Sequence, residues 1–294
     1  MFLRKRFKLR LPSRTLVLGE RTLVMGILNV TPDSFSDGGQ FLDADAAVAR
    51  ALEIERVGAD ILDIGGESTR PGAEPVSADE ELRRILPVLE KLRRQLTIPI
   101  SVDTSKPEVA EVAANHGAEI LNDVTGFRAG PALAEIARSH KLPLILMHMR
   151  GEPRTMHKGP FARDVMRDVS AGLRRSVAIA RRAGVSKSLI VLDPGIGFGK
   201  TVAQNFELLA RLPVLAHLGF PLLVGTSRKK FIGTALGGAP ENERRWGTAA
   251  TVAASILGGA HIVRVHDVAE MAQVARVTDA ILRTRQAAER DKSK

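Results

Sequence analysis

The chain has 294 residues, of which 44% are apolar and none is cysteine, and its 43 basic and 33 acidic residues give a net charge of +10. The absence of cysteine excludes disulfides, thiolate nucleophiles and cysteine-ligated metals. No apolar run approaches the roughly 18 residues that a membrane span needs, so we expect no membrane association.

Much of the positive charge lies at the two ends of the chain. The first ten residues, MFLRKRFKLR, hold five basic residues, and the last ten hold four. Tyrosine is absent and Trp246 is the only tryptophan, so stacking platforms for nucleic-acid bases are scarce. We therefore predict a solvated basic surface and no nucleic-acid partner. The N-terminus also lacks the pattern of a transit or signal peptide, so we expect an untargeted, cytoplasmic protein.

One unit recurs along the chain: a short apolar segment, a polar or glycine-rich loop, and an amphipathic stretch. Nearly continuous Val, Ile and Leu runs are typical of strands buried on both faces. The predicted strands are residues 23–30, 59–66, 98–104, 119–126, 142–149, 189–196, 221–227 and 261–268. Amphipathic stretches such as 43–59, 79–96 and 163–184 are predicted helices.

The number and spacing of these units favour a closed barrel over a doubly wound sheet. We predict an α/β protein consisting of a single (β/α)₈ barrel, the TIM-barrel fold, with a short N-terminal β extension. The predicted division is a basic extension over residues 1–18, the barrel over 19–288 and a polar tail over 289–294.

Polar residues end almost every predicted strand. A single residue of this kind is usually a helix N-cap, but the carboxyl ends of all barrel strands converge on one face, where active sites lie. We therefore hypothesise that these residues form a polar funnel: Asn29, Asp63, Asp103, Asn122, His148, Asp193, Ser227, Arg264 and His266.

A glycine-rich segment, GIGFGKT (195–201), superficially suggests a nucleotide-binding loop. A Walker A loop requires glycine where this chain has Pro194, and the glycine spacing does not fit the dinucleotide fingerprint. The seven histidines also lack metal-ligand spacing. We reject these three interpretations.

The loops after the first two strands carry candidate chemistry. In NVTPDSFSDGGQF (29–41), Asn29, Asp33 and Asp37 are hard oxygen ligands suited to Mg²⁺ shared with phosphates, although an Asx-rich turn is the alternative. In GGESTRPGAEP (65–75), Thr69 offers a hydroxyl and Arg70 a planar donor fork for an anion.

The later strands suggest a heterocycle next to a phosphate. Asp103, Asn122 and Asp193 together fit an aminopyrimidine edge, because buried carboxylates need hydrogen-bonding partners. TSRKKF (226–231) and VRVHD (263–267) add cations where barrels often bind phosphate, with Lys230 expected to be a solvated neighbour.

These loops resemble, in order, the motifs of the dihydropteroate synthases of folate biosynthesis. The segments that carry the resemblance are GILNVTPDSFSDGG, DIGGESTRPG, SVDTSKP, LNDVTG, DPGIGFGK, GTSRKKF and VRVHD, within about residues 22–285. The resemblance implies condensation of 6-hydroxymethyl-7,8-dihydropterin pyrophosphate with 4-aminobenzoate, with Mg²⁺ as cofactor. It also implies a dissociative substitution at the exocyclic methylene of the pterin.

The resemblance further implies roles for individual residues. The pterin would be bound by Asp103, Asn122, Asp193 and Lys229, with Met147 and Phe198 packing near it; the pyrophosphate and Mg²⁺ by Asn29, Arg70, Arg264 and His266; and the aminobenzoate by Phe35, Ser36, Arg70, Pro71, Ser227 and Lys229. Thr69 and Gly225 would also contact substrate, and the catalytic set would be Asp33, Asp37, Arg70 and Lys229, with Asp33 or Asp37 stabilising the cation.

The resemblance also suggests a homodimer. The apolar stretch at residues 248–257 is a candidate interface, although a plain core helix is the alternative reading.

Two other functions stay open at this point. A pterin-dependent methyltransferase acting on methyltetrahydrofolate would share the pterin floor, but the intact SFSDGG and TSRKKF segments speak against it. A non-catalytic pterin-binding or nucleic-acid-binding protein would release no pyrophosphate.

Overall fold

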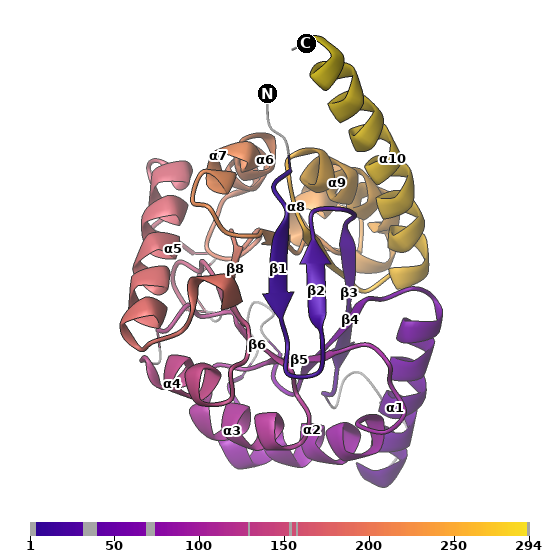
Figure 1. The fold of residues 1–294 in the computed structure, drawn as a ribbon, viewed down its shortest axis with the longest axis vertical. Helices are drawn as coiled ribbons and strands as arrows, with labels where there is room; N and C mark the ends of the chain where they lie inside the picture. Colours follow the sequence, from indigo (N-terminus) through magenta and orange to yellow (C-terminus); the bar gives the residue numbers. More distant parts are fainter. Residues whose placement is uncertain are drawn as a thin grey trace.

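The computed structural model describes residues 4–31, 40–68, 74–128, 130–152, 155, 156 and 158–292, without the side chains of 40–43 and 285–292. Eight parallel strands form a barrel surrounded by helices (Figure 1). The strands are β3 (Leu23–Asn29), β4 (Ile61–Gly65), β5 (Ile100–Asp103), β6 (Ile120–Asp123), β7 (Leu144–Met147), β8 (Ile190–Asp193), β9 (Leu223–Val224) and β10 (Ile262–Val265). Each lies within one predicted strand, and the predicted barrel is confirmed.

The barrel closes through its shortest strand. Seven neighbouring pairs run in the order β8-β7-β6-β5-β4-β3-β10-β9. A single parallel bridge between Leu192 and Leu222 joins β8 to the β9 side, and the Leu192 amide donates to the Pro221 carbonyl at 3.0 Å. The seam between β8 and β9 therefore has fewer backbone hydrogen bonds than the other strand pairs, and the barrel is nearly closed.

Helices connect the strands and cover the outside of the barrel. They are α1 (Gln40–Arg56), α2 (Ala78–Leu92), α3 (Pro107–Asn115), α4 (Ala132–Ser139), α5 (Val165–Arg182), α6 (Val202–Ala210), α7 (Leu212–Ala216), α8 (Lys230–Ala235), α9 (Arg245–Leu257) and α10 (Val268–Lys292), with short 3₁₀ turns η2 (Lys187–Leu189) and η3 (Glu241–Glu243). Local sequence fixes several starts: Ser77 caps α2, Asp164 caps α5, and Thr201 with Gln204 forms a capping box on α6.

An antiparallel hairpin of β1 (Phe7–Arg10) and β2 (Thr15–Leu18) lies across the barrel (Figure 1, indigo). Leu9, Leu11 and Leu18 pack in one cluster with the inward residues of the barrel strands, among them Met25 and Ile120. The hairpin therefore closes the end of the barrel opposite the carboxyl ends of the strands. The helix α10 continues past residue 288, and the three-part division of the chain remains a prediction.

The segment before the hairpin is anchored by a buried ion pair. Arg4 Nη2 donates to Asp279 Oδ1 of α10 at 2.9 Å, and Arg4 Nη1 donates to Thr22 Oγ1 at 2.7 Å. Both charged side chains are almost fully buried. His261 adds a second anchor, because its Nε2 lies 2.8 Å from the Lys5 carbonyl oxygen. Part of the basic N-terminus is thus structural.

Within the described ranges, no helix has both the length and the apolar character that crossing a bilayer requires.

We expect Arg4→Met to lower the free energy of unfolding by about 3 kcal/mol, because it leaves Asp279 buried without its cation. Urea unfolding followed by circular dichroism measures this loss. Arg10→Met, on an exposed residue of the same hairpin, is the matched control and should change little. Equal stability of the two variants would contradict the anchoring role.

Candidate active site

The carboxyl ends of the barrel strands bring most of the predicted polar residues to one mouth. His148, predicted in the same funnel, packs instead against α5, where a Cβ at Gly172 would lie 2.4 Å from its Cδ2. The strand register pairs Asn29 with Gly65, Gly65 with Asp103 and Asp103 with Asn122. Successive strand side chains alternate between the barrel interior and the helices, so residues at matching register share the interior. The same alternation places apolar residues one layer below, against the hairpin.

Arg264 of β10 makes two ion pairs in the interior. Its Nε donates to Asp63 Oδ2 at 2.5 Å, and its Nη2 donates to Asp103 Oδ2 at 2.7 Å. Asn122 Nδ2 also donates to Asp63 Oδ2, at 3.1 Å. Burial raises the pKa of Asp103 to about 8, with Arg264 opposing the rise and the Asp63 carboxylate adding to it.

Asp193 and Lys229 form the second polar group of the mouth. Met147 of β7 pairs in register with Asp193, whose Oδ1 accepts from the Gly195 amide at 2.7 Å. Burial raises the pKa of Asp193, and the charge of Lys229 opposes this. Burial lowers the pKa of Lys229 to about 8, and Asp193 opposes that in turn.

An apolar wall adjoins this group. Lys229 Nζ donates to the Ile196 carbonyl and lies 4.4 Å from the centre of the Phe198 ring. Phe198 packs against a small cluster of Val124, Met147, Met149 and Met156. Carboxylates, an amide and an amine beside an aromatic and methionine wall can recognise a flat heterocycle through both its edge and its face.

The last two strand ends are linked by Ser227 and His266. The His266 amide donates to Ser227 Oγ at 3.1 Å, and His266 Nδ1 lies 3.0 Å from the same oxygen. Gly225 stands just beyond β9, where an added Cβ would lie 3.7 Å from Arg264 Cβ. These positions bring the predicted β9 and β10 contributions to the same mouth.

Two of the basic residues considered at these strand ends point elsewhere. Arg228 has a positive φ of 57°, and its Nε and Nη2 donate to Asp267 at 3.0 and 2.5 Å. Its guanidinium therefore joins the β9 and β10 loops. Lys230 is exposed at the start of α8, as expected for a solvated neighbour.

Several buried polar residues near the mouth were not among the predicted substrate contacts. Asp63, predicted in the polar funnel but without a substrate role, is fully buried as a carboxylate inside the apolar run ILDIG. Lys106 donates to Glu67 and to the fully buried Glu81, the latter at 2.5 Å, which ties the start of the β4 loop to β5 and α2. Lys200 is buried behind Phe198. Nothing in the local sequence distinguishes these two lysines from solvated ones.

Seven predicted residues lie outside the described part of the chain, so their predicted roles stay predictions: Asp33, Phe35, Ser36, Asp37, Thr69, Arg70 and Pro71.

The candidate metal ligand Asn29 ends β3, half-buried at the mouth. Among the described residues, no group of three or more His, Asp or Glu side chains is arranged to hold a metal ion. A single amide oxygen fits Mg²⁺, which usually takes one or two protein ligands and completes its shell with water and substrate phosphate oxygens.

The fold and this mouth match a known class. Residues 25–266 match the family described as "Pterin binding enzyme", so the chain belongs to a family of barrel enzymes that bind pterins.

Its relatives are more specific. The chain is 52% identical over 265 residues to the dihydropteroate synthase of Synechocystis sp., covering 90% of this chain and 92% of that protein. The dihydropteroate synthase of Xanthomonas albilineans with 4-aminobenzoic acid is 44% identical, with a TM-score of 0.88 and coverage of 94% and 98%. Its complex with 7,8-dihydropteroate has a TM-score of 0.84, at 42% identity and coverage of 93% and 98%.

A third relative is the Yersinia pestis dihydropteroate synthase in complex with a sulfonamide drug, at 43% identity, a TM-score of 0.87 and coverage of 94% and 99%. The chain belongs to the dihydropteroate synthases, transferases of folate biosynthesis.

We expect Asp63→Ala to lower kcat/KM for dihydropteroate formation about 100-fold, because Arg264 and Asn122 lose the acceptor that orients them. Steady-state assays, with thermal melting to verify folding, measure this. Ser101→Ala is the control, since Ser101 is buried on the neighbouring strand and its hydroxyl has no partner among the described residues. Unchanged kinetics in Asp63→Ala would contradict the role of Asp63.

Proposed function

We propose that the barrel mouth joins 6-hydroxymethyl-7,8-dihydropterin pyrophosphate to 4-aminobenzoate and releases pyrophosphate and 7,8-dihydropteroate. The observation that carries the proposal is the set of buried Asp103, Asn122 and Asp193 with half-buried Lys229 beside Phe198. The ligands of the Xanthomonas albilineans relative, 4-aminobenzoic acid and 7,8-dihydropteroate, support both the second substrate and the product.

In this proposal the pterin binds by its aminopyrimidine edge. A carboxylate accepts from the ring N–H and the adjacent amino group together, and Asn122 supplies one donor and one acceptor. Lys229 donates to the pterin and Asp103 holds the remaining ring edge. Met147 and Phe198 contact the ring face, which excludes water and makes each polar contact stronger.

The pyrophosphate lies toward Asn29 and His266, with Arg70 and Arg264 as its cationic partners. Mg²⁺, when bound through Asn29, supplies positive charge that stabilises the departing pyrophosphate. Arg264 is already paired with Asp63 and Asp103, so it adds charge without being free to reorient fully.

The reaction is a dissociative substitution at the exocyclic methylene. The carbon–oxygen bond breaks and pyrophosphate leaves with the electron pair, while the electron-rich pterin spreads the positive charge. Asp33 or Asp37 stabilises that cation, with Arg70 and Lys229 completing the catalytic set. The aminobenzoate nitrogen then forms the new carbon–nitrogen bond and loses a proton to water. Because the amine attacks the methylene carbon directly, no covalent enzyme intermediate is needed.

The aminobenzoate pocket in this proposal is formed by Phe35, Ser36, Pro71 and Ser227, with Thr69 and Gly225 at its edges. The sulfonamide complex of the Yersinia pestis relative supports binding of such drugs to this pocket. The protein acts in the cytoplasm, without a nucleic-acid or membrane partner.

We also propose a homodimer. One face of α9, including Val252 and Ile256, is buried in the core. Its other side exposes Trp246 by 80%, and the adjacent α10 exposes Val277 by 62% and Ile281 by 55%. Exposed apolar residues on neighbouring helices are typical of a protein interface. Sedimentation velocity distinguishes the dimer from a monomer.

We expect dihydropteroate and pyrophosphate to form only when both substrates and Mg²⁺ are present. Pyrophosphate release and mass analysis of the product measure this, and leaving out each component in turn is the control. Pterin binding without product would contradict the proposal and favour methyl transfer or a binding role.

We expect kcat/KM to be highest below pH 8 and to fall as the pH rises through about 8, where Lys229 loses its proton. Asp103 ionises in the same range, so a single profile does not separate the two groups. Lys229→Arg separates them, because guanidinium stays charged. A fall that persists unchanged in this variant would contradict the assignment of the titration to Lys229.

A further inference from the structure

We propose that Lys200 is a positioning residue for the pterin pocket: its buried side chain holds the β8–α6 loop, residues 194–200, on the β7–α5 loop, so that Phe198 and the Ile196 carbonyl face Lys229. The inference rests on the pterin placement proposed above. Lys200 itself lies behind this loop and is not proposed to touch substrate.

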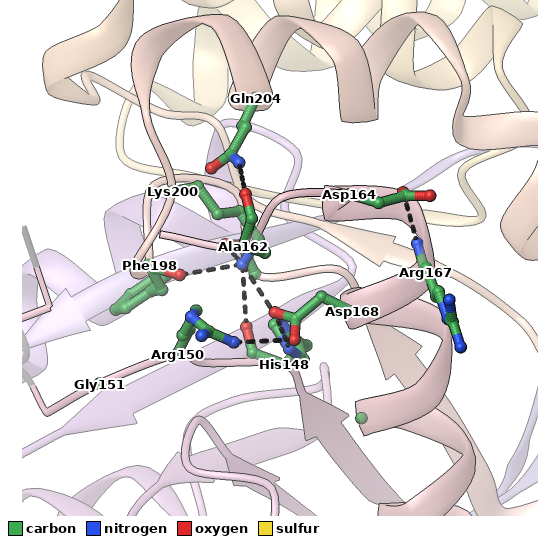
Figure 2. A network of polar contacts seen from close by, with 12 residues as sticks. His148, Arg150, Gly151, Ala162, Asp164, Arg167, Asp168, Phe198, Lys200 and Gln204 are labelled. Carbon is green, nitrogen blue, oxygen red and sulfur yellow. Dashed lines mark hydrogen bonds and ion pairs between the residues drawn. The ribbon is translucent and has the colours of Figure 1, made fainter. Parts of the chain in front are cut away.

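The Lys200 ammonium is surrounded by acceptors from two loops (Figure 2). Nζ donates to the carbonyl oxygens of Phe198 at 2.9 Å and His148 at 3.3 Å. The same nitrogen donates to the carbonyl oxygen of Gly195 at 2.8 Å. It also lies 3.2 Å from His148 Nδ1. One cation therefore binds carbonyls of both loops, and it fixes the backbone between Gly195 and Phe198.

This burial is costly for the cation. Lys200 forms no ion pair with a carboxylate of the described chain, and burial lowers its pKa to about 7, with Asp193 opposing the shift. Neutral carbonyls compensate a buried charge less well than a carboxylate does. The burial of this charge is explained if the function of Lys200 is to fix the conformation of the β8–α6 loop.

His148 is held as a fixed neutral acceptor. Its Nε2 lies 3.4 Å from Asp168 Oδ2, and Asp168 Oδ1 accepts from Arg150 Nη1 at 2.9 Å. The carboxylate thus favours the proton on Nε2 and leaves the Nδ1 lone pair toward Lys200. Burial lowers the pKa of His148 to about 3, so the ring stays neutral at working pH. The ring also packs on the α5 backbone, since a Cβ at Gly172 would lie 2.4 Å from His148 Cδ2.

The loop lies directly on its neighbours. A Cβ at Gly195 would lie 1.9 Å from the His148 carbonyl oxygen, and a Cβ at Gly199 would lie 1.9 Å from that of Arg150. On its other side, a Cβ at Gly197 would lie 2.8 Å from Lys229 Cδ. The β8–α6 loop is therefore packed tightly between the β7–α5 loop and Lys229. A change in backbone position around Lys200 would move Phe198.

The test is Lys200→Met, which keeps an unbranched side chain one atom shorter and removes its donors. We expect KM for the pterin pyrophosphate to rise about tenfold, with kcat and KM for 4-aminobenzoate within about threefold of wild type. Calorimetry with 6-hydroxymethylpterin should show a matching loss of affinity, and pyrophosphate binding with Mg²⁺ should be unchanged. Lys8→Met, on an exposed residue of β1, is the control and should leave all of these values unchanged.

A second variant keeps the proposal testable if Lys200→Met does not fold. Asp168→Asn alters the partly exposed end of the same chain of contacts and should raise the same KM about threefold. The double variant should be no worse than Lys200→Met alone, because both changes act through one link. Folded Lys200→Met with wild-type pterin affinity, a loss confined to kcat, or an unchanged pterin KM in Asp168→Asn would overturn the proposal.

The calorimetric measurement of pterin binding distinguishes a failure of this inference from a failure of the proposed reaction. Wild-type protein that binds 6-hydroxymethylpterin but forms no product sinks the proposed reaction and leaves Lys200 testable through affinity. Wild-type protein that binds no pterin overturns both.

Discussion

The guanidinium of Arg264 organises the mouth of the barrel. It reaches from β10 past β3 to carboxylates on β4 and β5, strands with which β10 shares no backbone hydrogen bonds. The two buried carboxylates depend on the one cation, because Arg264 donates to both of them. Asn122 donates to the same oxygen of Asp63. Side chains from four strands, β10, β4, β5 and β6, therefore meet in one network.

The inward-facing side chains of the strands are apolar at one end of the barrel and largely polar at the other. Inward positions near the amino ends of the strands are apolar and meet the hairpin leucines, whereas on β4, β6, β8 and β10 the inward positions two residues later are Asp, Asn or Arg. The buried pair of Arg4 and Asp279 belongs to the first end and holds the chain where no chemistry is proposed. Barrels commonly separate stability from function in this way, because loops at the carboxyl ends can vary without disturbing the closed sheet.

Most of the fold was predictable because it depends on local patterns. Continuous apolar runs indicate buried parallel strands, and a polar residue at the end of each run predicts convergence at one mouth. The two-residue length of β9 and the pairing of Arg4 with Asp279 were not predictable, since both depend on residues distant in sequence. The position of the Arg228 side chain depends on a positive φ that its sequence does not suggest.

The candidate site was predictable where a residue stands on a strand and less so where its role depends on a partner. Asp103, Asn122 and Asp193 end their strands, so register alone brings them to the mouth. Lys200 belongs to a segment that resembles a phosphate-binding loop, yet its ammonium faces carbonyls behind the loop. Only the folded backbone shows which way such a long side chain points.

The cations at the mouth and in the loops beside it do not belong to the solvated basic surface of the chain. Arg264, Arg228, Lys229 and Lys200 are all engaged by carboxylates or carbonyls of the protein. The positive charge of the N-terminal segment, apart from Arg4, lies on the exposed side chains of Lys5, Arg6, Lys8 and Arg10 and is screened by salt. An anion entering the mouth therefore competes with Asp63 and Asp103 for Arg264 instead of meeting an open basic patch. Specific recognition then requires a ligand that satisfies the carboxylates as well, and a pterin linked to pyrophosphate presents both donors and negative charge in one molecule.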